Sequence, residues 1–206
     1  MLDINNFRDN KLKRKMWFFI IIMDSDERED YFKQLEGART KFYEQNGKNL
    51  VFKNKQKLEC AQSVTKEFDL QKMIECTAFI VPNSNVVYYN YLVFKIYGNE
   101  SNRIEVYSHI MGLINSVLEK YDTFEVHVNL KSFTISACHR YYTMISSTFD
   151  ENTLLTDKMS KLVIYNTPHL LDQITSVLYS SVKAVLPKTE YYYKDSQTRI
   201  NRLFDI

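Results

Sequence analysis

The cysteines and histidines are the side chains of this chain best suited to metal binding, redox chemistry or nucleophilic catalysis. They are Cys60, Cys76, Cys138, His109, His127, His139 and His169. The cysteines are odd in number and far apart, so they predict neither a disulfide framework nor a Cys-x-x-Cys metal pair. The histidines lack a metal-ligand spacing, and no Gly-x-Ser-x-Gly, Walker or His-Glu-x-x-His motif is present. We therefore expect reduced cysteines in a cytoplasmic protein, with no metal or other cofactor.

Two aspartates after an apolar run are the remaining candidates for catalysis. The segment Phe18–Asp26 reads FFIIIMDSD and resembles the Asp-x-Asp strand of haloacid-dehalogenase-type phosphatases, whose first aspartate is the nucleophile. The resemblance would give that role to Asp24, with Asp26 as its partner. However, Glu27 and Arg28 follow, where the family has Thr or Val, and no Gly-Asp-x-x-x-Asp loop lies downstream. We interpret the chain as non-catalytic, with a phosphatase as the enzyme alternative.

Composition places the chain among ordinary globular proteins. Its 206 residues are 45% hydrophobic and 14% aromatic, with 15 Tyr but only 4 Gly and 3 Pro. So few glycines and prolines argue against glycine-rich phosphate loops and long disordered linkers. The net charge of +2 provides no strong field for a nucleic acid, so we expect no nucleic-acid partner.

The strongest hydrophobic run is Met16–Met23, and a basic cluster precedes it at Lys11–Lys15. A charged segment before an apolar one is typical of a signal peptide, but acidic rather than small residues follow this run. The run is also far too short to span a bilayer. We interpret it as a buried strand or core segment, and a peripheral membrane anchor on anionic lipid is the alternative.

The chain divides into two regions by composition and periodicity. Residues 1–67 are rich in Lys, Glu and Gln and predict a mostly helical cap, with a helix beginning near Asp24 or Ser25. A second helical segment covers Lys55–Cys76. Residues 68–206 alternate strand patterns with helix patterns, which is typical of an α/β domain.

The second region contains five strand patterns and four helix patterns. The expected strands are Ala78–Val81, Val86–Tyr97, Phe124–Leu130, Leu162–Tyr165 and Glu190–Lys194. The expected helices are Ile104–Tyr121, Ala137–Phe149, Leu170–Leu186 and one that begins near Ser196. The turn Pro82–Asn85 joins the first two strands as a hairpin. The remaining alternation implies parallel βαβ units, so we predict a mixed, mostly parallel sheet with helices packed on it.

Three segments of this pattern resemble the CRAL-TRIO lipid-binding fold, the family of the phosphatidylinositol and phosphatidylcholine transfer proteins. The hairpin Phe79–Tyr97 stands where the family has its opening strands. The segment Val126–Lys131, VHVNLK, resembles the family's V-x-V-D-L-x strand. The segment Leu162–Thr189 resembles its strand, Asn-x-Pro turn, long helix and terminal Lys-Thr. The order and spacing of all three carry the resemblance, which covers residues 68–206.

The chain departs from the family pattern at two points. Asn129 replaces the usual aspartate of the V-x-V-D-L-x strand, and Leu170 and Leu171 replace the aromatic residue after the Asn-x-Pro turn. These features are closer to the divergent members, such as the lipid-binding module of neurofibromin and the BCH domains of Rho GTPase regulators.

The resemblance implies an apolar pocket with a sheet as its floor, helices as its walls and helix 170–186 as its gate. Such a pocket binds a phospholipid or another hydrophobic ligand without catalysis. The residues expected to line it are Tyr89, Tyr91, Phe94, Val126, Val128, Tyr141, Ile145, Phe149, Leu171, Ile174 and Leu178. The residues expected to contact an anionic headgroup or membrane are Lys183, Lys188, Arg199 and Arg202.

Two alternatives remain open. The same residues can simply fill a core, in which case the chain is a protein-interaction module of the BCH type that acts as a scaffold or regulator. The chain can also be an α/β protein of another fold. A cavity no larger than a few waters would favour the interaction module, because its tyrosines and phenylalanines would then fill the pocket.

Overall fold

The computed structural model describes residues 23–150 and 153–204. Met16–Ile22, the larger part of the N-terminal apolar run, lies outside the described residues. Met23 is buried and its sulfur lies 3.5 Å from the sulfur of Cys76. Within the described residues, no helix is long and apolar enough to cross a membrane.

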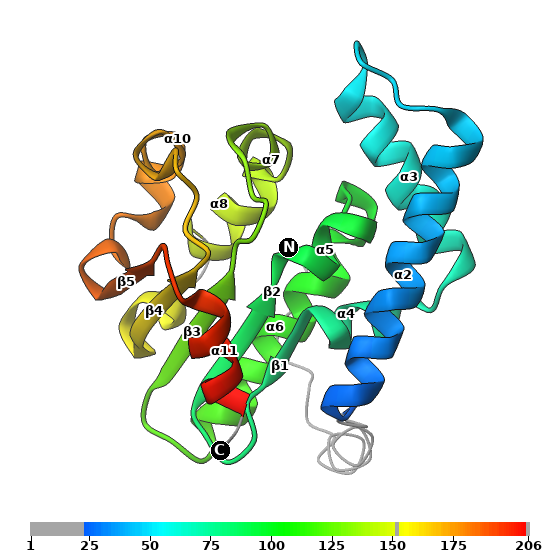
Figure 1. The fold of residues 1–206 in the computed structure, drawn as a ribbon. Coiled ribbons are helices and arrows are strands. Elements are labelled where there is room, and N and C mark those ends of the chain that lie inside the picture. Colours follow the sequence, from blue (N-terminus) through cyan, green and yellow to red (C-terminus); the bar gives the residue numbers. More distant parts are fainter. Residues whose placement is uncertain (1–22, 151–152, 205–206) are drawn as a thin grey trace, which may run out of the picture.

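A five-stranded sheet forms the centre of the fold (Figure 1). Its strands are β1 (Ala78–Ile80), β2 (Val86–Asn90), β3 (Phe124–Asn129), β4 (Met159–Tyr165) and β5 (Thr189–Tyr192). The strands are ordered as in the sequence. β1 pairs antiparallel with β2, and the other pairs are parallel. The predicted hairpin and the predicted mixed, mostly parallel sheet are confirmed.

The parallel strands are joined by helices that cover one face of the sheet. These are α6 (Arg103–Leu118), α7 (Ile135–Arg140), α8 (Tyr142–Asp150), α9 (Thr153–Lys158) and α10 (Leu171–Val182). Crossovers of one hand between successive neighbouring strands place their helices on the same side. The core on this side contains Leu113 and Ile114 of α6 beside Phe124 of β3. The last helix, α11 (Ser196–Phe204), packs on the opposite face through Ile200 and appears in red in front of the sheet (Figure 1).

The N-terminal helical region flanks the β1 side of the sheet (Figure 1). It comprises α2 (Ser25–Asn46), α3 (Lys53–Glu67) and α4 (Leu70–Thr77). Asp24 caps α2 by accepting a hydrogen bond from the Glu27 amide at 2.8 Å, as expected. Leu35 and Val64 of this region share one apolar core with Phe94 and Tyr97. The helical region therefore packs directly against the α/β region.

The long strand predicted at Val86–Tyr97 is wrong. β2 ends at Asn90, and the next seven residues form the helix α5 (Tyr91–Tyr97). The Asn90 side chain caps this helix by accepting a hydrogen bond from the Leu92 amide at 3.1 Å. Most of the helix is buried against α2, α3 and α4, and burial on nearly all sides overrides the strand preference of its aromatic and β-branched residues.

Three predicted helices differ from those observed. The segment Lys55–Cys76 forms two helices, α3 and α4, because Asp69 caps a new helix by accepting from the Lys72 amide at 2.9 Å. The segment Ala137–Phe149 also forms two helices, α7 and α8, which meet at Tyr141. The helix predicted at Leu170–Leu186 ends at Val182, and a short 3-10 helix, η3 (Leu186–Lys188), follows it. Helix α9 was not predicted from the sequence.

Candidate ligand-binding cavity

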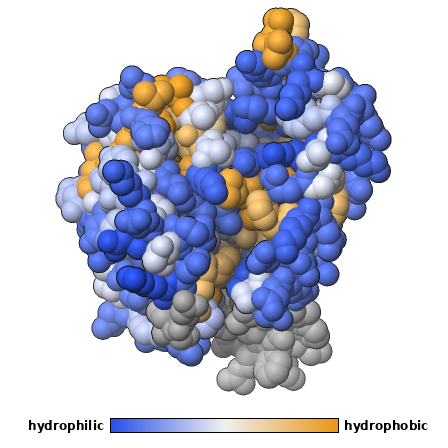
Figure 2. All heavy atoms as spheres, viewed as in Figure 1, coloured by the Kyte–Doolittle hydropathy of each residue, from blue (hydrophilic) through white to orange (hydrophobic). Residues whose placement is uncertain are grey.

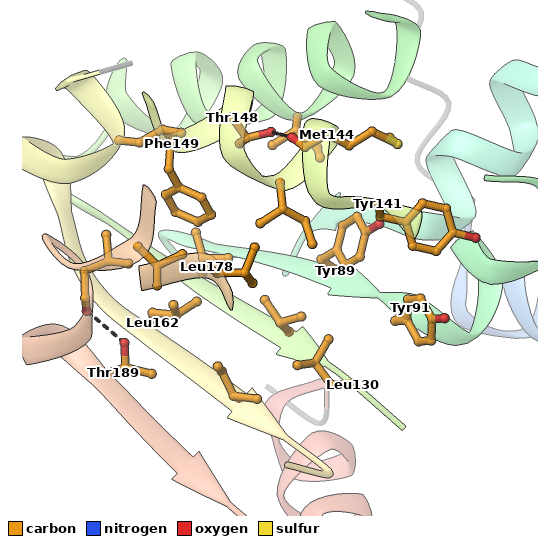
Figure 3. A pocket seen from close by; sticks show the side chains of 18 of the residues that line it. Tyr89, Tyr91, Leu130, Tyr141, Met144, Thr148, Phe149, Leu162, Leu178 and Thr189 are labelled. Atoms are coloured by element: carbon orange, nitrogen blue, oxygen red, sulfur yellow. Dashed lines mark hydrogen bonds between the residues drawn. The ribbon is translucent and has the colours of Figure 1, made fainter. Parts of the chain in front are cut away.

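An apolar cavity of about 270 Å³ lies between the sheet and the helices of its covered face (Figure 3). Side chains of β2, β3, β4 and β5 form its floor. Helix α6 forms a wall, and α8 and α10 close it from the side opposite the sheet. Figure 3 shows the Phe149 ring of α8 directed toward the floor across the cavity. All eleven residues expected from the sequence to line a pocket line this cavity.

The floor of the cavity has an unusual pattern of burial. Its apolar side chains lie at the centre of the sheet, yet they remain partly exposed. Val126 and Val128 of β3 are only half-buried, whereas His127 and Asn129 on the other face are 7% and 5% exposed. Alternation along a strand ordinarily buries the apolar side and exposes the polar one. In β3 the polar side is the buried one, because α11 covers it. The valines on the apolar side remain partly exposed, because they face the open cavity.

Register brings the floor residues together. Tyr89, Val128 and Ile164 occupy one row across β2, β3 and β4, and Tyr191 of β5 continues it. All four line the cavity. Neighbouring strands lie about 4.8 Å apart, so the row forms a continuous floor that is mainly hydrocarbon.

Tyrosines gather at one end of the cavity. Tyr89, Tyr91 and Tyr141 lie together there (Figure 3). The Tyr141 hydroxyl donates a hydrogen bond to the Gly98 carbonyl at 3.3 Å. Burial raises the pKa of Tyr89 well above its ordinary value, and within the part of the chain that the structure describes its hydroxyl has no hydrogen-bond partner. Tyr89 lines the cavity and is only partly buried, so its hydroxyl is free to pair with a polar group of a ligand.

Arg103 is the one charged side chain among the described residues that line the cavity. Its Nη1 lies 3.4 Å from the Ser147 hydroxyl, and its Nε lies 2.8 Å from a Glu100 carboxylate oxygen. The buried Nε makes no well-aligned hydrogen bond in the described part of the chain, so the contact with Glu100 is an ion pair held by charge. Arg103 is one-third exposed and can therefore meet an anionic group at the edge of the cavity.

The four basic residues expected to contact a headgroup do not converge on the cavity. Lys183 is exposed at the end of α10, whereas Arg199 and Arg202 lie on α11, against the other face of the sheet. Arg199 stacks on the Tyr192 ring at 4.1 Å. The Lys188 ammonium donates to the carbonyls of Thr156 and Met159 at 2.7 and 2.8 Å, so it holds η3 against the start of β4.

Sequence reasoning missed Arg103, although a signal for it was present. Arg103 precedes Tyr107, Ile110 and Ile114 at spacings of four, three and four residues, which place all of them on one face of α6. An arginine that continues an apolar helical face marks the point where that face reaches water or a polar ligand.

The other candidates for chemistry have structural explanations. Asp24 is exposed and caps α2, and within the described ranges no group of His, Cys, Asp and Glu could hold a metal ion. Cys60, Cys76 and Cys138 are buried, and none of them forms a disulfide. Burial raises the pKa of all three thiols, for Cys76 to about 12, which disfavours the reactive thiolate.

A polar network occupies the opposite face of the sheet. His127 Nδ1 lies 2.9 Å from the Tyr165 hydroxyl, and its Nε2 lies 3.2 Å from a Glu125 carboxylate oxygen. Lys161 and Glu190 form an ion pair at 3.1 Å on the adjacent strands. Burial lowers the pKa of His127 below its ordinary value of 6.5, although Glu125 opposes the shift.

This network predicts a loss of stability at mildly acidic pH. In the unfolded chain His127 regains a pKa of about 6.5. At pH values below about 6.5 and above the lower pKa of the folded state, His127 is therefore more protonated in the unfolded chain than in the folded one. The free energy of unfolding should therefore be constant above pH ~6.5 and fall as the pH decreases from there. Urea unfolding of the wild type and of His127→Gln checks this. An equally steep decline in the variant would assign the effect to another group.

Comparison of the chain with protein-family models, with curated proteins and with solved structures gave no match. The family resemblance therefore stays an interpretation of motif order. The functional argument depends on the cavity itself.

Proposed function

We propose that this protein binds a phospholipid or another hydrophobic ligand in the cavity between the sheet and helices α6, α8 and α10, without catalysing a reaction. The accessible apolar floor at the centre of the sheet carries this proposal. Transfer of the bound lipid between membranes would follow from the same site. Helix α10 is the gate, because Leu171, Ile174 and Leu178 close the cavity along one side of that helix.

The size of the cavity supports a ligand on energetic grounds. A closed, empty apolar void costs about 24 cal/mol per Å³, so a cavity of about 270 Å³ would cost at most about 6 kcal/mol if it closed without a ligand. That is comparable with the whole stability of a typical domain, about 5–15 kcal/mol. Each buried methylene of an acyl chain contributes about 0.8 kcal/mol. Roughly eight methylenes would therefore offset the cost of the void.

A protein-interaction module is the second candidate. It requires that aromatic side chains fill the space between sheet and helices. Tyr89, Tyr91, Phe94 and Phe133 are close enough to line the space, but they leave it open. The unfilled volume therefore favours the ligand-binding proposal over the interaction module.

Native mass spectrometry of protein purified without detergent tests the proposal. We expect a co-purified lipid mass that is released on denaturation, and uptake of lipid from liposomes by the stripped protein. The absence of both a bound mass and lipid uptake would overturn the ligand-binding proposal and favour the interaction module.

Arg103 is expected to anchor the polar end of an acidic ligand. Removing a hydrogen-bonded charge costs about 1.5–3 kcal/mol, so Arg103→Gln should weaken binding of an acidic lipid roughly 10- to 100-fold. Binding of a neutral lipid with the same acyl chains should change little. Titration of stripped protein with phosphatidic acid and with diacylglycerol measures both. Arg202→Gln is the matched control, because Arg202 is exposed on α11. Equal losses for both lipids would contradict this role of Arg103.

A further inference from the structure

The loop between α2 and α3 carries three consecutive exposed apolar side chains. Leu50, Val51 and Phe52 are 77%, 80% and 63% exposed. Figure 2 shows them as the hydrophobic tip that projects from the upper end of the helical region. Single exposed apolar residues are common on protein surfaces, but three in succession at the tip of a projection suggest a contact surface.

The loop is ordered by hydrogen bonds that point its polar groups inward. The Asn49 side-chain oxygen accepts from the amides of Val51 and Phe52 at 2.9 and 2.8 Å. The buried Gln56 side chain accepts from the Asn49 amide and donates to the Gly47 carbonyl. Gly47 has a φ of 63°, which suits glycine at the end of α2. The fold thus holds the backbone in place and leaves the apolar side chains in solvent.

Lysines flank this apolar tip in the sequence. Lys48, Lys53, Lys55 and Lys57 are exposed, and no acidic residue occurs between positions 48 and 57. Lys55 lies 4.0 Å from the Glu59 carboxylate, so it is the one lysine of the four with an acidic partner among the described residues. The first turn of α3 contains no acidic residue, although the partial positive charge at a helix N-terminus favours one. Positive charge concentrated at this helix end complements an anionic surface.

We propose that this tip docks the protein onto an anionic lipid membrane. Leu50, Val51 and Phe52 insert between the lipid headgroups, and the flanking lysines contact lipid phosphates. Two attractions hold a peripheral protein at a membrane interface, which are the burial of apolar side chains and the attraction of cations to anionic lipid. The tip and its neighbouring lysines can provide both. Neither Leu50–Phe52 nor the lysines line the cavity, so this inference stands apart from the proposed function.

The tip is connected to the helices near the cavity. Asn54, at the start of α3, accepts hydrogen bonds from Ser136 and Arg140 of α7 at 3.1 and 2.7 Å. In the views of Figures 1 and 2, helix α10 and the hydrophobic atoms over it lie at the same upper end of the molecule as the tip. Leu170, which precedes α10, is itself 47% exposed. A membrane that receives the tip would therefore lie on the side of the candidate gate.

Vesicle co-sedimentation of the full chain tests the proposal. The probes are vesicles of phosphatidylcholine alone and of phosphatidylcholine mixed with phosphatidylserine. The wild type should prefer the anionic vesicles, and L50S/V51S/F52S should lose about 100-fold or more in affinity. Replacing Lys53, Lys55 and Lys57 by Gln should remove most of the preference for phosphatidylserine, at roughly fivefold per lysine. Tyr193→Ser, an exposed aromatic change elsewhere, should bind like the wild type.

Two further measurements distinguish a loss of membrane binding from a loss of folding and from a loss of the ligand in the cavity. Thermal unfolding should be unchanged in the tip variants, because the replaced side chains are exposed, and co-purified lipid should be retained because the tip lies outside the cavity. Wild-type binding by L50S/V51S/F52S, or no binding of the wild type to anionic vesicles, would overturn the membrane proposal. A concentration-dependent dimer in sedimentation velocity that L50S/V51S/F52S abolishes would overturn it in favour of a second copy as the occupant.

Discussion

Val128→Phe is expected to abolish ligand uptake and leave the protein folded. Val128 lies at the centre of the sheet, yet it is half-buried because it faces the cavity. A phenylalanine there would extend into the space that an acyl chain needs. We expect affinity to fall by at least about 100-fold, because the lost burial of only a few methylenes accounts for that factor. Lipid uptake from liposomes and native mass spectrometry measure it.

The stability of the same variant distinguishes a cavity from a core. In a packed core, inserting a larger side chain costs about 1–3 kcal/mol. Val163 is the matched control, because it lies on the neighbouring strand β4 but is 3% exposed and packs on the opposite face. Val163→Phe should therefore destabilise the protein by that amount, whereas Val128→Phe should match the stability of lipid-stripped wild type or exceed it. Equal destabilisation by both would show that the cavity is closed in solution.

Leu35→Ala is expected to destabilise the whole chain by about 2–5 kcal/mol. Leu35 is completely buried, and it shares a core with Val64 of α3 and with Phe94 and Tyr97 of α5. The core therefore contains residues of both the helical region, α2 to α4, and the α/β region. Because both regions contribute to one core, they should unfold together.

Chemical unfolding followed by circular dichroism and by tyrosine fluorescence tests this cooperativity. The two signals should give one coincident transition in the wild type and in Leu35→Ala, at lower denaturant in the variant. Leu50→Ala is the control, since Leu50 is 77% exposed and its truncation should change stability by no more than about 0.5 kcal/mol. Two separate transitions would mean that the helical region, α2 to α4, forms an independent unit.

Periodicity in the sequence was sufficient to predict most of the α/β region. The period of two at Phe124–Leu130 correctly places Val126 and Val128 on the same face of a strand. The period of 3.6 at Ile104–Tyr121 correctly predicts a helix, which is observed as α6. These predictions succeed because side-chain direction follows local geometry, which depends only on spacing along the chain.

Prediction failed where burial is nearly complete. A run such as Tyr91–Tyr97 has no polar face, so periodicity cannot distinguish a buried helix from a buried strand. The choice depends on packing, because this segment contacts α2, α3 and α4, which come from other parts of the chain.

The contacts of Lys188 also depend on tertiary packing and could not be predicted from the sequence. Its charge predicts a surface cation, but two carbonyls from the α9–β4 connection hold its ammonium.

The sequence by itself determined which side chains share a face within each regular element, such as Val126 and Val128 on one side of β3, whereas the choice of pocket residues came from the family resemblance. Only the tertiary structure decided that these faces enclose an unfilled space, because a void depends on the summed volumes and positions of side chains from distant segments. The structure also decided which cation faces the cavity. Arg103 lies there because α6 crosses the covered face of the sheet, whereas Arg199 is carried to the other face by α11. Charge is a property of the residue, but its location depends on how the chain folds around the sheet.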